Sequence, residues 1–180
     1  MKQIHGLMQT VALAIALGIP ASCSATEPLH DILFIDGHDG PFFPEKCCWV
    51  DLPRTEKLIA ARRQENCSAI GGPVGRFRIA DGKVWLVGLR RCGGDMPLKE
   101  IFPELGNPAF AKWLNGAFRA EVNHMCLSPF SFGSLYRTTF RLEIKDGVVT
   151  DMQRQENDEA DCRKSGTEPQ GKTAIERKQN

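Results

Sequence analysis

Alternation of apolar and polar residues is the strongest pattern in this chain, and it occurs twice around an Asp-Gly pair. The first copy runs over residues 76–89 with Asp81-Gly82 in the middle, and the second over 139–152 with Asp146-Gly147. Alternation indicates strands with one buried face, and Asp-Gly suits a tight turn because glycine adopts a positive φ without steric cost. The sequence therefore predicts two β-hairpins.

Shorter patterns predict the other elements. The apolar run 31–36 predicts a buried strand and 117–122 predicts another, while the Gly and Pro residues between 37 and 48 indicate a loop. Helical spacing of apolar residues predicts a helix over 55–63, and a second helix is expected over 108–114 with Asn107 as its cap.

These elements predict one domain that is mainly β or α+β. We expect an antiparallel, hairpin-built sheet with two or three short helices, stapled by disulfides. The globular domain is expected over residues 26–155. Residues 156–180 are almost entirely polar, so they are expected to form a disordered C-terminal tail.

The first 25 residues have the pattern of a secretory signal peptide. Lys2 precedes an apolar stretch over 11–19 that is too short to span a bilayer, and small residues follow as far as Ala25. Cleavage after Ala25 predicts a periplasmic or secreted protein. A second interpretation stays open, because the small residues before Cys23 also fit a lipoprotein signal. Lipidation of Cys23 would anchor the protein to the outer membrane and is the only membrane contact expected.

The cysteines support export into an oxidising compartment. The chain has seven cysteines, and removal of the leader with Cys23 leaves an even set, which in an exported chain predicts three disulfides. The members of this set are Cys47, Cys48, Cys67, Cys92, Cys126 and Cys162. The neighbours Cys47 and Cys48 are expected to bond different partners. Zinc is disfavoured because the chain has no CxxC pair.

Charge excludes some partners and suggests one. The formal net charge is +1, so there is no global field that would attract nucleic acid or a membrane surface. Alternation puts an arginine-bearing side on each of several predicted strands, and these sides form one face if the strands are neighbours. The arginines are Arg76, Arg78, Arg119, Arg137 and Arg141. Guanidinium groups bind carboxylates and phosphates, so this face predicts an acidic partner. The alternative is a solvated face whose own acidic residues offset the arginines.

A weaker metal-binding pattern surrounds the first strand, in His30, Asp36, His38 and Asp39. On an extended strand His30 and His38 would lie roughly 26 Å apart at 3.3 Å per residue, so both reach one ion only if the strand folds back. Cys47 also stands where a calcium loop of the EF-hand type needs Glu. A metal site and an ordinary polar turn both remain open.

No catalytic motif is recognisable, and no cofactor is predicted. The chain has neither a nucleophile elbow nor a phosphate-binding glycine loop, and a disulfide-bonded Cys126 is no nucleophile for His124. We therefore expect a non-catalytic exported protein that binds another protein, as an inhibitor, an immunity factor or an accessory of an envelope complex. The alternatives are a small glycan-active or hydrolytic enzyme, and a structural or metal-binding envelope component.

Overall fold

The computed structural model describes residues 29–46, 49–64, 72–127, 134–158 and 162. Its elements, in chain order, are β1 (Asp31–Ile35), β2 (His38–Pro44), α2 (Glu56–Gln64), β3 (Val74–Ala80), β4 (Lys83–Arg91), β5 (Gly94–Met96), α3 (Leu98–Ile101), β6 (Ala109–Phe110), β7 (Gly116–Leu127), β8 (Ser134–Lys145) and β9 (Val148–Glu156). The described part of the chain is therefore mostly β with two short helices, as the sequence predicts.

The strands form a single mixed sheet in the order β3-β1-β2-β7-β8-β9-β4-β5, with β6 on the edge of β4. Since β3 also pairs with β4, the path of strands closes into a ring. Every pairing is antiparallel except that of β1 with β3, where Ile32 lies opposite Arg76. The prediction of a purely antiparallel sheet is thus wrong at this pair. After β2 the chain crosses over through α2 and returns beside β1 in the same direction, a connection that parallel strands require.

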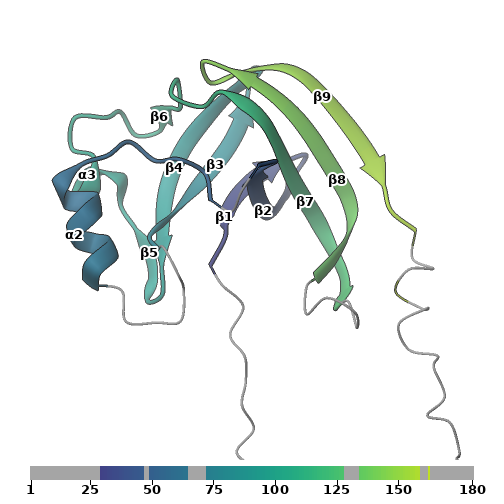
Figure 1. Cartoon of the computed structure of the whole chain (residues 1–180), viewed down its shortest axis with the longest axis horizontal. Helices are drawn as coiled ribbons and strands as arrows, with labels where there is room; N and C mark the ends of the chain where they lie inside the picture. Colours follow the sequence, from purple (N-terminus) through teal and green to yellow (C-terminus); the bar gives the residue numbers. More distant parts are fainter. Residues whose placement is uncertain (1–28, 47–48, 65–71, 128–133, 159–161, 163–180) are drawn as a thin grey trace, which may run out of the picture.

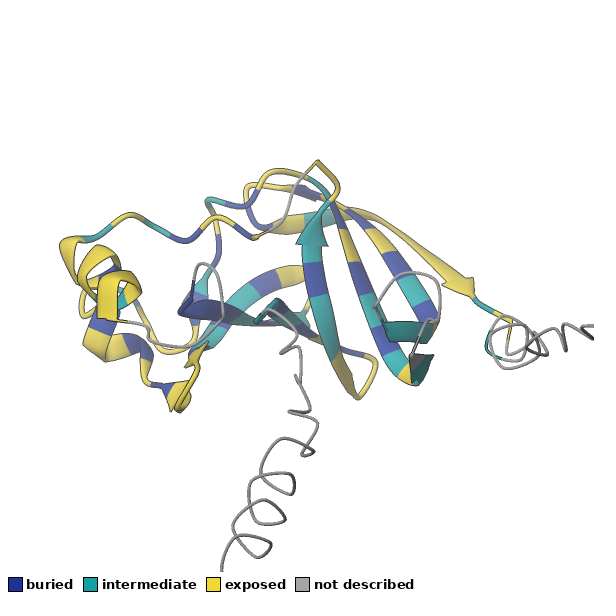
Figure 2. Ribbon diagram, turned by 60° about the horizontal axis from the view of Figure 1, so that its bottom comes forward, coloured by how far each residue is buried: buried dark blue, intermediate teal, exposed yellow. Residues whose placement is uncertain are grey.

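The sheet has the shape of an arch (Figure 1). β3 and β4 form one side, β7, β8 and β9 form the other, and the β1–β2 hairpin lies between them. The core fills the inside of the ring, where the Phe42 ring contacts those of Phe77 and Phe118 at centroid distances of 5.5 and 5.2 Å. Buried and exposed residues alternate along β8 (Figure 2). Full burial of an apolar side chain of this size stabilises the fold by about 1.5–3 kcal/mol.

Three Asp-Gly turns shape the sheet. They are Asp36-Gly37 (φ 51° and 82°), Asp81-Gly82 (52° and 68°) and Asp146-Gly147 (49° and 77°). Positive φ at both central residues is the geometry of the tight turn that matches the twist of the strands. The two predicted hairpins are confirmed as β3–β4 and β8–β9. The first turn joins β1 to β2, so the prediction of a loop over 37–48 is wrong for residues 38–44.

Gly40 explains why β2 was mistaken for a loop. A Cβ at this position would lie 1.8 Å from the backbone oxygen of Glu121 on the neighbouring strand β7. The glycine therefore marks a close approach of two strands, which is one of the few reasons for glycine inside a strand. Pro41 still occupies a paired position, opposite Ile32 of β1.

One predicted helix is confirmed and the other is wrong. The helix expected over 55–63 is α2, and the N–H of Leu58 donates to the Thr55 hydroxyl oxygen at 3.1 Å, which caps its first turn. The helix expected over 108–114 is absent from the structure. Ala109 and Phe110 instead form β6, which pairs with Leu86 and Trp85 of β4. Pairing with a buried strand overrides the local helical spacing there.

The cysteine prediction is tested only in part. Cys126 at the end of β7 is bonded to Cys162, and Cys92 is also disulfide-bonded. Cys47, Cys48 and Cys67 lie outside the described residues, as do the expected signal peptide and the chain beyond residue 162. Over the ranges that the structure describes, no helix has the length and apolar character needed to cross a membrane.

Candidate functional site

Asp31 is the one ionisable residue that is buried in the described part of the chain, and its role is structural. It is 1% exposed. One carboxylate oxygen accepts a hydrogen bond from the N–H of Val50 at 2.7 Å, and the other from the N–H of Gly75 at 2.6 Å. Burial raises the pKa of Asp31 to about 6, against the opposing effect of these two bonds and of the Arg62 charge. Both oxygens are already used, so the carboxylate joins β1 to β3 and to the segment before α2.

The five arginines predicted to share one face lie on three strands. Arg76 and Arg78 are on β3, Arg119 is on β7, and Arg137 and Arg141 are on β8. Because β1 and β2 separate β3 from β7 in the sheet, the set is divided into two groups. The structure does bring Arg119 and Arg141 directly opposite each other.

Several of these arginines already have partners within the sheet. Arg76 forms an ion pair with Asp95 at 2.6 Å, and Arg119 forms one with Glu121 at 3.2 Å. The guanidinium of Arg78 lies 5.4 Å from the centre of the Phe34 ring. These contacts support the interpretation of a solvated face with internal charge compensation.

The four candidate metal ligands are spread along the β1–β2 hairpin. The His30 ring packs against Phe43 with centroids 5.0 Å apart, whereas His38 lies opposite Ile35, next to the turn at the other end of the hairpin. Asp36 is in that turn and Asp39 is in β2. Within the described residues, no three His, Cys, Asp or Glu side chains gather closely enough to hold a metal ion.

The outer edge of β9 is a feature that was not predicted from the sequence. β8 pairs with β9 along its whole length, from Val148 to Glu156. On the other side β4 reaches only Val148, with one further hydrogen bond from the Val149 N–H to the Gly82 oxygen at 2.8 Å. No strand in the described part of the chain pairs with this edge over residues 150–156. Figure 1 shows β9 diverging from β4 beyond the turn.

The direction of each backbone group on this edge follows from one hydrogen bond. The N–H of Asn157 donates to the Arg137 oxygen at 2.7 Å, so Asn157 faces β8. Backbone groups alternate in direction along a strand, so those of Met152, Arg154 and Glu156 point away from β8. β9 is exposed at every residue except Val149 (Figure 2). The edge therefore presents backbone donors and acceptors to solvent.

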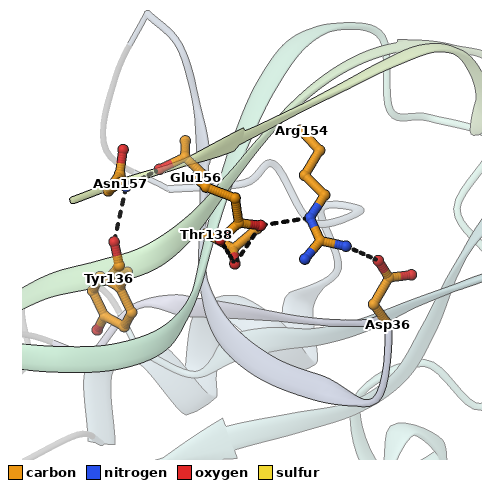
Figure 3. A network of polar contacts seen from close by, with 7 residues as sticks. Asp36, Tyr136, Thr138, Arg154, Glu156 and Asn157 are labelled. Carbon is orange, nitrogen blue, oxygen red and sulfur yellow. Dashed lines mark hydrogen bonds and ion pairs between the residues drawn. The ribbon is translucent and has the colours of Figure 1, made fainter. Parts of the chain in front are cut away.

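Side chains hold β9 in position without covering this edge (Figure 3). Arg154 forms ion pairs with Glu156 at 2.7 Å and with Asp36 of the β1–β2 turn at 3.6 Å. The Thr138 hydroxyl of β8 donates to Glu156 at 3.1 Å. The pKa of Glu156 is lowered, mainly by the hydrogen bond from Arg154. This network connects β9 to β8 and to the β1–β2 turn.

A signal for the open edge was present in the sequence. Beyond Met152, where the alternating pattern ends, the chain reads Gln-Arg-Gln-Glu, with no apolar residue for either face of a strand. A strand with polar residues on both faces is not packed on both sides. Comparisons with protein-family models, with curated proteins and with solved structures found no match for this chain. Any function must therefore be inferred from the geometry of the chain itself.

Proposed function

We propose that this is an exported, non-catalytic binding protein that takes an extended segment of another protein along the open edge of β9. The observation that carries the proposal is the backbone of residues 150–156, which no described strand covers, on a strand whose other edge is fully paired. A peptide that adds a strand to such an edge gains main-chain hydrogen bonds for affinity and side-chain contacts for specificity.

The side chains of β9 define the partner's chemistry. Met152 is 50% exposed and offers an apolar contact beside the edge, whereas Arg154 and Glu156 follow it on the same face with opposite charges. Cross-strand pairs of matching character contribute roughly 0.2–1 kcal/mol each. The partner segment thus carries an apolar residue near Met152, followed by charged residues in the complementary order.

Two features favour a selective partner over pairing between copies of this chain. The β8–β9 pairing has an irregularity between Glu143 and Ile144, and Arg154 and Glu156 are charges on the inward face of the edge strand. Bulges and inward charges are devices that prevent indiscriminate pairing at sheet edges. A partner strand with charges complementary to Arg154 and Glu156 can pair with this edge, whereas a strand without them is disfavoured.

Export and the absence of catalysis have separate support. The Cys126–Cys162 disulfide is compatible with an oxidising compartment. Among the described residues, Asp31 is the carboxylate whose pKa is raised by burial, and both of its oxygens are engaged by backbone N–H groups. A general acid or base needs a free atom within hydrogen-bond reach of a substrate.

The test uses one position of β9 and two substitutions. Met152→Pro removes an outward N–H and blocks an incoming strand, and proline is tolerated at a sheet edge where that N–H faces solvent. Met152→Ala removes the side chain and keeps the N–H. A partner captured by the wild-type protein from the exported fraction should bind Met152→Pro at least about tenfold more weakly, and Met152→Ala within a few-fold of wild type.

Hydrogen exchange supplies the second measurement. The partner should protect the amides of Met152, Arg154 and Glu156, and sedimentation should show a complex of unlike chains. Binding that survives Met152→Pro unchanged, or protection that falls elsewhere on the sheet, would contradict the proposal. Circular dichroism of both variants checks that each is folded.

A further inference from the structure

A hollow of about 340 Å³ lies between the two sides of the arch, and none of the residues that line it belongs to β9. Its apolar lining is Leu29, Ile32 and Pro41, and its polar lining includes Asp39 of β2, Arg90 of β4 and Tyr136 of β8. β4 and β8 stand on opposite sides of the arch in Figure 1, with β1 and β2 between them. The hollow is therefore built from strands that are far apart in the sequence.

Two opposite charges line this hollow without a partner among the described residues. Asp39 and Arg90 are both exposed, and neither side chain forms an ion pair or a hydrogen bond with any described residue, including the other. The nearby strand β3 shows the contrasting case, because Arg76 there is paired with Asp95 at 2.6 Å. The hollow thus presents a carboxylate and a guanidinium that are both available to a ligand.

We infer that the hollow binds a small zwitterionic peptide. The ammonium group of the peptide pairs with Asp39, and its carboxylate pairs with the fork of Arg90. The side chains of the peptide lie on the apolar surface of Ile32 and Pro41. Small-ligand sites combine apolar surface with a few placed polar groups that fix the orientation of the ligand, and this hollow has both.

The size of the hollow limits the peptide. A volume of about 340 Å³ corresponds to roughly eleven water molecules at about 30 Å³ each. That space matches the size of a dipeptide or tripeptide. This site is separate from the β9 edge, so it would add a second ligand to the proposed protein partner.

The experiment compares three forms of one dipeptide, Ala-Leu, on the full exported protein by calorimetric titration. The unmodified zwitterion should bind saturably at millimolar or lower concentration. The N-acetylated form loses the ammonium and the C-amidated form loses the carboxylate, so each should bind at least about tenfold more weakly. A site for simple anions would lose only the amidated form, and that outcome would overturn the inference.

Substitutions of Asp39 and Arg90 test which end of the peptide each side chain binds. Asp39→Asn should bind the free and N-acetylated peptides equally, and Arg90→Gln should bind the free and amidated peptides equally. Arg91→Gln, which changes the exposed neighbour of Arg90, should bind as wild type does. Equal binding of all three peptide forms by wild type, or no binding of any form at millimolar concentration, would refute the inference.

The β9 variant separates this result from the proposed function. Met152→Pro should bind the dipeptide as wild type does. Dipeptide binding that disappears in Met152→Pro while the protein stays folded would place the ligand at the edge and overturn the assignment to the hollow.

Discussion

The β3–β4 and β8–β9 hairpins have similar turns, but the outer edges of their second strands differ. Each has an Asp-Gly turn with nearly the same positive φ values. The outer edge of β4 is covered by β6 and then by β5, with Leu86 opposite Ala109 and Leu89 opposite Met96. In the described part of the chain, the outer edge of β9 is covered only at its first residues.

The difference lies in the second strand of each hairpin. β4 buries Val84, Leu86 and Leu89 completely, so it must lie over the core, where other strands meet it. β9 buries no side chain, and it is held by β8 and by the ion pair of Arg154 with Asp36. A turn sequence therefore specifies a hairpin, whereas the burial of the returning strand decides whether its far edge is covered.

Removal of the Asp31 carboxylate, which joins β1 to the first strand of the β3–β4 hairpin, should have the largest effect on stability. Asp31→Ala leaves the N–H groups of Val50 and Gly75 buried without an acceptor. Each such group costs about 1–3 kcal/mol, so the free energy of unfolding should fall by roughly 2–6 kcal/mol. Urea denaturation measures the loss. Asp51→Ala, at an exposed position, serves as the control and should change stability by less than about 0.5 kcal/mol.

The contributions of Asp31, beside β3, and of Glu156, in β9, to the free energy of unfolding should change with pH in opposite directions. Burial raises the pKa of Asp31 from 3.8 to about 6, so the folded state holds this proton more tightly than the unfolded state. The contribution of Asp31 to the free energy of unfolding therefore decreases as pH rises from about 4 to about 6, by on the order of 3 kcal/mol. The lowered pKa of Glu156 gives the opposite sign, with a contribution that is lost as pH falls through its folded pKa. Exposure keeps this second effect small.

Urea titrations at several pH values between 4 and 7 measure the pH effect. Asp31→Asn should be less stable than wild type at low pH, yet its stability should vary less over this range because the shifted carboxyl group is gone. Glu156→Gln should keep the slope that Asp31 causes. An unchanged slope in Asp31→Asn would show that another group titrates.

Local signals in the sequence were sufficient for the parts of the fold that short segments determine. The turns at Asp81 and Asp146, the apolar run of β1 and the capped helix at Thr55 were all predictable for this reason. The Asp36-Gly37 turn was not predicted because Gly40 and Pro41 look like loop residues, and only the close approach of β7 explains the glycine.

The β9 edge and the hollow both depend on which strands become neighbours in the sheet. A single sequence does not show the order of the strands. Alternation correctly put Arg119 and Arg141 on one face, but the position of β1 and β2 between β3 and β7 separates them from Arg76. The open edge of β9 and the hollow beside Arg90 are likewise results of strand order. The parallel pairing of β1 with β3 sets that order, and it joins segments about forty residues apart.

Hydrogen exchange of single amides should give the finest contrast between the hairpins. In β4 the Val84 N–H donates to the Gly147 oxygen at 2.8 Å, and Trp85 pairs with Arg78 of β3, so consecutive amides should both be protected. In β9 the amides of Gln153 and Gln155 face β8 and should be protected, whereas those of Met152 and Arg154 face solvent and should exchange fast. Continuous protection along β9 in the isolated protein would mean that its edge is already covered. Alternating protection that becomes continuous when the partner is added would connect the contrast between the hairpins directly to binding.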